Sequence, residues 1–208
     1  MILSTRTARP LILAALFAAA ATLTASARES APAPVAIQKG RITIAGSSNV
    51  HEWSAETTTV RVTHARLGAP VPASSFGDQI VQPGVLGEFE IAVPAASLKS
   101  GKDGLDKNMY KALKVNEHAD ITFRLTRLEP SADGVFNATG VLRIAGVERE
   151  VQLDLRAQPS GSTVTVSGAV DLLMTDFGIK PPTAMLGMLK TDPKVTVSFE
   201  TVLTAPLT

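Results

Sequence analysis

Histidine is the first residue type to examine for chemistry, because it binds metals and transfers protons near neutral pH. The chain contains His51, His64 and His118, which are separated by 13 and 54 residues. Zinc sites are recognised in sequences by closely spaced ligands, as in H-E-x-x-H. The wide spacing predicts no metal site. His51 lies in an expected strand and is predicted to make a structural hydrogen bond.

Nucleophilic and acid–base catalysis have equally little support in the sequence. The chain has no cysteine and no G-x-S-x-G motif. Asp171 and Asp176 lie five residues apart, but paired carboxylates do acid–base work only when they face each other across a cleft. Asp176 with Gly178 is more typical of a turn. We therefore expect no catalytic residues and a non-catalytic binding protein.

The aromatic residues argue against sugar and nucleic acid ligands. Trp53 and Tyr110 are the only Trp and Tyr, beside seven Phe. Surfaces that stack bases need more exposed rings and a basic groove, so we expect no nucleic acid partner. Trp53 is expected to be an anchor in the core or at a rim.

Four methionines have two interpretations, as gap-filling core residues or as an adaptable lining for a flexible apolar ligand: Met109, Met174, Met185 and Met188.

Residues 1–27 have the pattern of a secretory signal peptide. Arg6 and Arg9 precede an apolar stretch at residues 11–23, and Ala25-Ser26-Ala27 fits an A-x-A cleavage site. The apolar stretch is too short for a comfortable membrane span; an uncleaved anchor is the alternative. Cleavage would leave 181 of the 208 residues, with 18 basic and 19 acidic side chains, no cysteine and no integral membrane segment. We expect a periplasmic or secreted protein.

From Ala36 to Leu203 the chain alternates apolar and polar residues with a period of two. Such alternation indicates strands with one dry and one wet face. Phe89, Ile91 and Val93 are one example, and Val60, Val62 and His64 are expected to share a face in the same way. We expect about eight strands in one domain at residues 36–204, with a flexible lead-in at 28–35 and a tail at 205–208. Residues 70–84 hold three prolines and two glycines and are predicted to form a loop.

Two segments interrupt the strand pattern. Residues 104–114 predict an amphipathic helix, with Asp103 as its cap and an apolar face that includes Leu105, Met109 and Leu113. Residues 175–192 connect two expected strands and carry six large apolar residues. Because loops are normally polar, an apolar connector is expected to cover an apolar interior. We expect both segments at the mouth of one barrel.

A closed barrel and a two-sheet sandwich both fit short connections between antiparallel strands. The barrel is favoured because segments of nine to eleven residues would span roughly 30–36 Å, which is long for a sandwich. About eight strands also suit a barrel that holds one small ligand. Small residues lie on the dry faces at Ala138, Gly140 and Gly168. They indicate either close approach of a ligand or relief of strain in a bent strand.

Five segments, in order, resemble the YceI-like, polyisoprenoid-binding family: GSSNVHEW at 46–53, AVPAASL at 92–98, residues 106–109 leading to ITF at 121–123, GVLRIAGVER at 140–149, and TDFGI at 175–179. The resemblance covers about residues 37–203. It implies an extended, antiparallel, lipocalin-like β-barrel with one or two short helices near the mouth. It also implies that a long apolar chain, such as an isoprenoid quinone tail or another amphiphilic lipid, binds inside.

We therefore predict a protein that sequesters or carries an amphiphilic lipid and needs no cofactor beyond that isoprenoid or quinone-like lipid. The alternatives are a ligand-free periplasmic module that contacts stress or redox partners, and an enzyme of unknown reaction on the same barrel. An unpaired edge at the first or last strand would allow a homodimer. The predicted ligand-binding residues are Phe89, Ile91, Met109, Phe123, Phe136, Leu142, Leu153, Val166, Val170, Phe177, Ile179, Met185, Leu186, Val197 and Phe199.

Overall fold

A computed structural model describes residues 34–132, 134–184 and 188–206. The predicted signal peptide at 1–27 and most of the lead-in lie outside the described residues. The strands are β1 (Ala36–Ser48), β2 (Glu52–Thr57), β3 (Arg61–Leu67), β4 (Leu86–Pro94), β5 (Asp120–Ala132), β6 (Val135–Ile144), β7 (Val147–Ser160), β8 (Thr163–Leu173), β9 (Thr183–Ala184) and β10 (Leu189–Thr204). The helices are α1 (Phe76–Ile80) and α2 (Asp103–Leu113), with 3₁₀ turns η1 (Ala73–Ser75), η2 (Ala95–Ser97) and η3 (Met174–Phe177).

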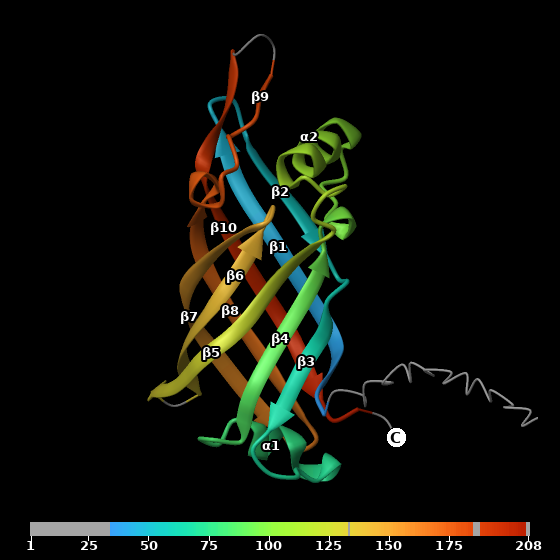
Figure 1. Cartoon of the computed structure of the whole chain (residues 1–208), viewed down its shortest axis with the longest axis vertical. Helices are drawn as coiled ribbons and strands as arrows, with labels where there is room; N and C mark the ends of the chain where they lie inside the picture. The colour runs from blue at the N-terminus through green and yellow to red at the C-terminus, as the bar shows by residue number, and fades with distance from the viewer. Residues whose placement is uncertain (1–33, 133, 185–187, 207–208) are drawn as a thin grey trace, which may run out of the picture. The chain divides into compact units, whose positions relative to one another are not determined.

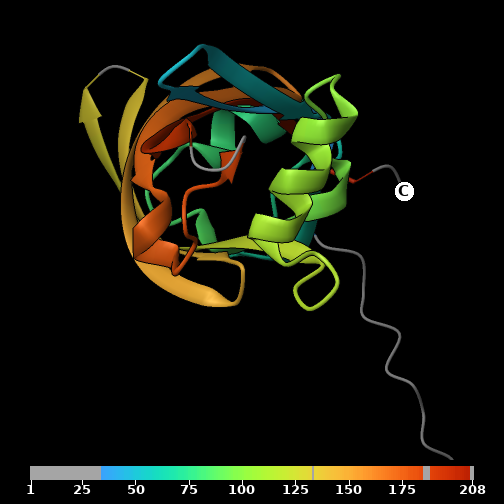
Figure 2. The same ribbon diagram turned by 90° about the horizontal axis from the view of Figure 1, so that it is seen from above.

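The strands form one antiparallel sheet in the order β2-β1-β10-β8-β7-β6-β5-β4-β3, and the short β9 pairs with the start of β10. The sheet curls into a tall barrel (Figure 1), and the view from above shows it curving round on itself (Figure 2). This confirms the predicted all-β, antiparallel, lipocalin-like architecture. The main path has nine strands, close to the expected eight.

The first and last strands are not edges of the sheet. β1 and β10 pair with each other from Ala36↔Thr204 to Ser48↔Thr191, so the edge strands are β2 and β3. The expectation of an unpaired edge at the first or last strand is therefore wrong, because β1 and β10 each have a paired strand on both sides. The homodimer itself stays a prediction.

The segment between η2 and α2 pairs with the edge strand β2. Glu56 and Lys99 exchange two backbone hydrogen bonds of 2.9 and 2.8 Å. Nearby, the hydroxyl groups of Thr57 and Ser97 lie 2.7 Å apart. Leu98 is 1% exposed, so it is buried behind this pairing. The pairing is a single antiparallel bridge along the outer edge of β2.

The outer wall carries ion pairs between neighbouring strands. Arg41 pairs with Glu56 at 2.6 Å, and Lys194 pairs with Asp171 at 2.8 Å.

The pairing of β3 with β4 shifts register between Val62 and His64. This bulge turns His64 outward, where its ring lies 2.7 Å from Glu88. The expectation that His64 shares a face with Val62 is wrong, because a bulge breaks the alternation.

Residues 70–84 are not simply a loop, because they contain η1 and α1. Phe76 is 0% exposed and Ile80 is 4% exposed, and both pack in a core cluster with Val164 and Leu203. The backbone N–H of Gly77 donates to the carbonyl oxygen of Gly161 at 2.7 Å. A Cβ at Gly77 would lie 1.7 Å from the Thr163 carbonyl oxygen, so the helix touches strand backbone directly. Helix α1 therefore closes the end of the barrel opposite α2 (Figure 1).

The predicted helix at 104–114 is α2, and it lies at the other end of the barrel with its apolar face inward. Leu113 is buried, and Met109 and Ala112 pack against the same core cluster. Asp103 is not the cap: Lys102 precedes the helix without a side-chain capping bond, and Asp103 lies in the first turn. Within the described residues, no helix has the length and apolar character needed to cross a membrane.

Candidate ligand cavity

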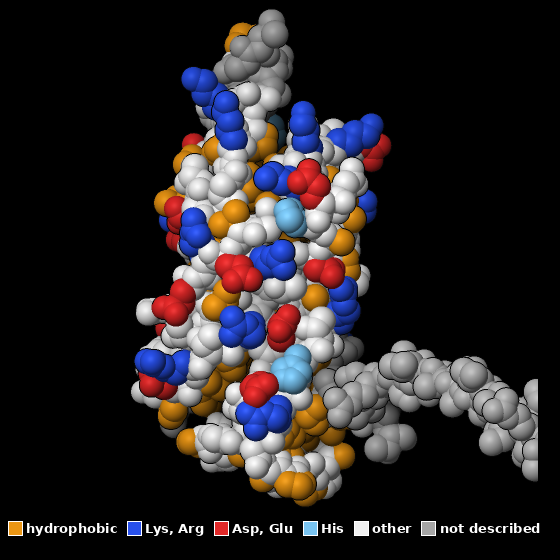
Figure 3. Space-filling model, viewed as in Figure 1, with side chains coloured by type: hydrophobic (Ala, Val, Ile, Leu, Met, Phe, Trp, Pro, Cys, Tyr) orange, Lys and Arg blue, Asp and Glu red, His pale blue; other side chains and the backbone are white. Residues whose placement is uncertain are grey.

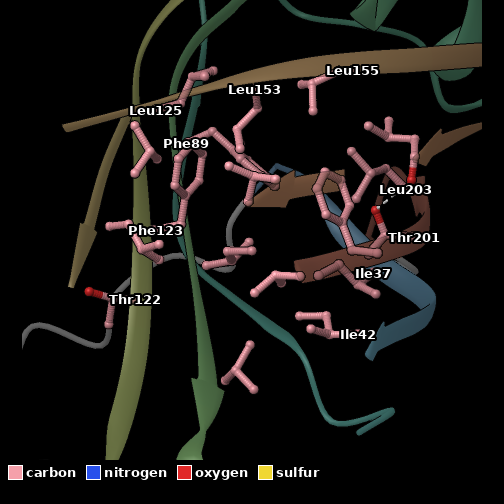
Figure 4. Close-up of a pocket in the computed structure, with 18 of the residues that line it drawn as sticks. Ile37, Ile42, Phe89, Thr122, Phe123, Leu125, Leu153, Leu155, Thr201 and Leu203 are labelled. Atoms are coloured by element: carbon pink, nitrogen blue, oxygen red, sulfur yellow. Dashed lines mark hydrogen bonds between the residues drawn. The ribbon is translucent and has the colours of Figure 1, made fainter. Parts of the chain in front are cut away.

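The barrel encloses a cavity whose lower chamber, on the side of α1, has a volume of about 220 Å³. Its lining is almost entirely apolar, and the polar members among the described residues are Thr122 and Thr201. The Thr201 hydroxyl donates to the Val166 carbonyl oxygen at 3.4 Å. Figure 4 shows side chains from β1, β4, β5, β7 and β10 directed into one common space. A polar or charged solute would lose its hydration here without gaining partners.

Ten of the predicted ligand-binding residues line this chamber. They are the inward members of the strand alternation: Phe89, Ile91, Phe123, Phe136, Leu142, Leu153, Val166, Val170, Val197 and Phe199. Sequence reasoning left out Ile37, Ile42 and Ile44 of β1, although they alternate in the same way and also line the chamber. It could not include Ile80 and Val81, because they come from the segment expected to be a loop.

Two glycines on the dry faces lie under phenylalanine rings. A Cβ at Gly140 would lie 2.3 Å from Phe123 Cζ, and a Cβ at Gly168 would lie 2.8 Å from Phe199 Cζ. In the sheet, Gly168 is directly opposite Phe199. The glycines therefore make room for aromatic rings that are themselves part of the lining. This differs from both sequence-based interpretations of these positions.

The upper chamber, beneath α2 and the η3–β9 connector, has a volume of about 270 Å³. Met109, Phe177 and Ile179, all predicted ligand-binding residues, line it. Met185 and Leu186, the remaining two, lie outside the described residues. The two chambers share five lining residues, which places them end to end along the barrel: Ile44, Ile121, Ile144, Leu172 and Val197.

Polar lining residues gather in the upper chamber. Together with apolar side chains, this chamber is lined by Ser48, His51, Lys102, Asn108, Thr183 and Thr191. Because His51, Lys102, Asn108 and Thr183 are exposed, the chamber opens to solvent at this end. Figure 2 looks down on it and shows α2 and the segment containing β9 on different sides of the barrel. Sequence reasoning missed these residues because they come from separate segments that share no sequence pattern: the end of β1 and the β1–β2 turn, the start and middle of α2, β9 and the start of β10.

The hairpin of β9 and β10 is held to the β1–β2 turn by hydrogen bonds. The Asn49 side chain donates to the Met188 carbonyl oxygen at 2.8 Å and accepts from the Lys190 backbone N–H at 2.9 Å. The Ser47 hydroxyl donates to Asp192. These bonds position one border of the opening.

Trp53 also lies at this end of the barrel. A Cβ at Gly46 would lie 2.5 Å from its ring, so the ring packs directly on the β1 backbone. Its indole N–H donates to the Ser47 carbonyl oxygen at 3.3 Å. Trp53 lines both the upper chamber and a polar surface groove beside it, so it forms part of the wall between them. This agrees with the expected rim anchor.

The residues considered for chemistry are not brought together. His51 lines the upper chamber, His64 faces outward beside Glu88, and the His118 ring packs over Gly146. Asp171 lies on the outer wall, where Lys194 and Thr196 hold the pKa of its carboxyl below the ordinary value. Within the described residues, no group of three or more His, Asp or Glu side chains could hold a metal ion.

Comparison with protein-family models assigns residues 50–203 to the YceI-like domain. The chain belongs to the YceI-like family. The match spans the sequence from the β1–β2 turn to the end of β10 and so includes every strand of the barrel except β1. A search of curated proteins found no match.

Solved structures with the same fold come from several bacteria. BcnA of Burkholderia cenocepacia is 15% identical, with a TM-score of 0.60 over 78% of this chain and 95% of that chain. A polyisoprenoid-binding domain from Saccharophagus degradans, implicated in plant cell wall breakdown, is 13% identical, with a TM-score of 0.61 over 84% and 99%. A mutant YceI protein of Campylobacter jejuni is 15% identical, with a TM-score of 0.55 over 77% and 85%. At these identities the similarity establishes the fold.

Proposed function

We propose that this YceI-like protein binds one amphiphilic lipid, with a long isoprenoid-type tail in the barrel and a polar headgroup at the mouth. The observation that carries the proposal is the distribution of polarity in the cavity. The lower chamber is apolar and is closed by α1, whereas the polar lining lies in the upper chamber, beside the opening. An elongated ligand with one polar end matches this order. The polyisoprenoid-binding domain from Saccharophagus degradans, which has the same fold, supports the class of ligand.

The driving force is burial of the tail. Removing about 300 Å² of apolar ligand surface from water would contribute roughly 7–8 kcal/mol before the cost of ordering the ligand is subtracted. Phenylalanine rings on β4, β5, β6 and β10 provide much of the contact surface. Headgroup specificity would come from Lys102, His51 and Asn108, whose side chains offer hydrogen-bond donors at the opening.

The protein acts by holding its ligand and not by making or breaking bonds. The proposed setting is the periplasm or the cell exterior, because residues 1–27 have the pattern of a secretory signal. There the protein would sequester the lipid or carry it through water between membranes or partners.

Val197 tests the path of the tail, because it lies where the two chambers meet. Val197→Trp would block the passage. We expect it to weaken binding of a long-chain quinone or prenol at least about tenfold, since tenfold corresponds to only about 1.4 kcal/mol of lost burial. Binding of a short-tailed quinone should change little.

The matched control is Ser198→Trp, at the neighbouring, exposed position on the outer face of β10. It should leave both affinities unchanged. Equal affinity of Val197→Trp and the unaltered protein for the long-chain ligand, measured by fluorescence titration, would contradict a tail that passes through both chambers.

A further inference from the structure

Two exposed apolar side chains mark the tip of the barrel at its mouth. Val50 is 67% exposed and Met188 is 68% exposed. They belong to the β1–β2 turn and the β9–β10 hairpin, which Asn49 joins through its bonds to Met188 and Lys190. Single exposed apolar residues are common on protein surfaces. This pair is different because both residues lie on adjoining turns beside the cavity opening.

Lysines gather at the same end. Of the nine lysines in the described residues, eight fall within residues 99–114 and 180–194, which form α2, its flanks and the β9–β10 hairpin. Figure 3 shows basic side chains around this end. Seven of the eight are exposed and have no carboxylate within ion-pair distance among the described residues: Lys99, Lys102, Lys107, Lys111, Lys114, Lys180 and Lys190. On the barrel wall, Arg41, Arg61 and Arg66 each pair with a carboxylate, whereas Arg124, Arg127 and Arg156 have no ion-pair partner among the described residues.

The acidic residues at this end only partly offset the lysines. Asp106 accepts hydrogen bonds from Ser100, and Asp192 accepts one from Ser47. In the mouth segments, residues 47–52, 99–118, 145–150 and 174–194, nine basic residues face eight carboxylates, whereas the rest of the described residues include eight basic and nine acidic ones. The mouth end therefore has a slight positive excess, and all but one of its basic residues are lysines.

We propose that the mouth end docks on the surface of an anionic phospholipid bilayer. Val50 and Met188 enter the interface between headgroups and acyl chains, and the lysines of α2 and the hairpin contact lipid phosphates. Basic side chains near an anionic leaflet each strengthen binding by roughly fivefold, and the attraction falls off within a Debye length. In this orientation the cavity opening faces the bilayer, so a lipid tail passes between them with little exposure to water. The docking surface goes beyond the proposed function and does not depend on the identity of the cavity ligand.

The test is co-sedimentation of the purified protein with vesicles that contain no isoprenoid lipid. One set is phosphatidylcholine alone, and the other is phosphatidylcholine mixed with phosphatidylglycerol. We expect binding to the mixed vesicles that weakens as salt is added. The triple variant Lys107→Gln, Lys111→Gln, Lys190→Gln should lower the partition coefficient by at least about tenfold. Val50→Ser with Met188→Ser should also lower it.

The matched control removes the same charge from the wall through Arg124→Gln, Arg127→Gln and Arg156→Gln, at exposed positions on β5 and β7. It should retain binding within about twofold, since these residues would lie beyond a Debye length from the bilayer. Equal binding to both kinds of vesicle, or equal loss in the wall and mouth variants, would overturn the docking surface.

Quinone affinity in solution, measured on the same variants, separates the two proposals. Unchanged quinone binding by the mouth triple, with lost vesicle binding, supports a docking surface distinct from the cavity. A protein that binds quinone but ignores anionic vesicles would overturn docking alone. One that binds vesicles but no long-chain lipid would overturn the proposed function alone.

Discussion

Gly140 and Gly168 show how single residues shape the cavity wall. Each lies under a phenylalanine ring, and a Cβ at either position would also press on backbone carbonyl oxygens, 2.7 Å away at Gly140 and 2.9 Å away at Gly168. A ring can tilt, but a strand carbonyl that belongs to the sheet cannot move easily. The two glycines are therefore required by packing.

We expect Gly140→Ala to destabilise the fold by about 1–3 kcal/mol, the usual range for overpacking a core. Urea unfolding at neutral pH measures the change. Gly104→Ala in α2 is the control, because a Cβ there would have no neighbour within 4 Å and alanine favours helix. A Gly140→Ala protein as stable as the Gly104→Ala protein would contradict the close packing.

Asp106 provides a second test at the residue scale. The Ser100 hydroxyl and the Ser100 backbone N–H donate to its carboxylate at 2.6 and 2.8 Å and lower its pKa below the ordinary value of 3.8. A carboxyl with a lowered pKa stabilises the folded state above its unfolded pKa and loses that contribution as the pH falls through the folded pKa. The stability gap between the unaltered protein and Asp106→Ala should therefore be full at neutral pH and shrink below about pH 3.8. Urea midpoints against pH measure it, and a constant gap would contradict the assignment.

Among the elements, the strands were the most predictable and α1 the least. Alternation identified ten inward-facing wall residues because a strand's side chains change face at every residue. Where a bulge interrupts that period, as before His64, the same reasoning fails. Helix α1 has only five residues, too few for a helical period to show, and its glycine and flanking prolines are typical of loops. The polar rim of the cavity was missed for a related reason, since its residues come from several distant segments that share no sequence pattern.

Helix α1 is predicted to hold the closed end of the barrel through Phe76. Phe76→Ala should cost about 3–5 kcal/mol, because the ring is fully buried and its removal leaves a cavity. The control is Val81→Ala, next to the helix, where a smaller and only partly buried side chain is trimmed. Urea unfolding that gives equal losses for the two variants would show that α1 does not close the core.

At the scale of the whole molecule, the barrel has one end closed by α1 and one end bordered by polar and basic residues. The family and the fold could be predicted from five short motifs in order. The gathering of lysines at the mouth could not be predicted, because net charge does not depend on position and α2 and the β9–β10 hairpin line one chamber only in the folded chain. The order of the two chambers along the barrel axis could not be predicted from the sequence either.

The most direct test of lipid binding is to extract the purified protein with organic solvent and analyse the extract by mass spectrometry. We predict one lipid per protein, with a long apolar tail and a polar headgroup, and less of it from Val197→Trp prepared in the same way. An extract without lipid, together with no binding of an added long-chain quinone or prenol by the emptied protein, would contradict the proposed function.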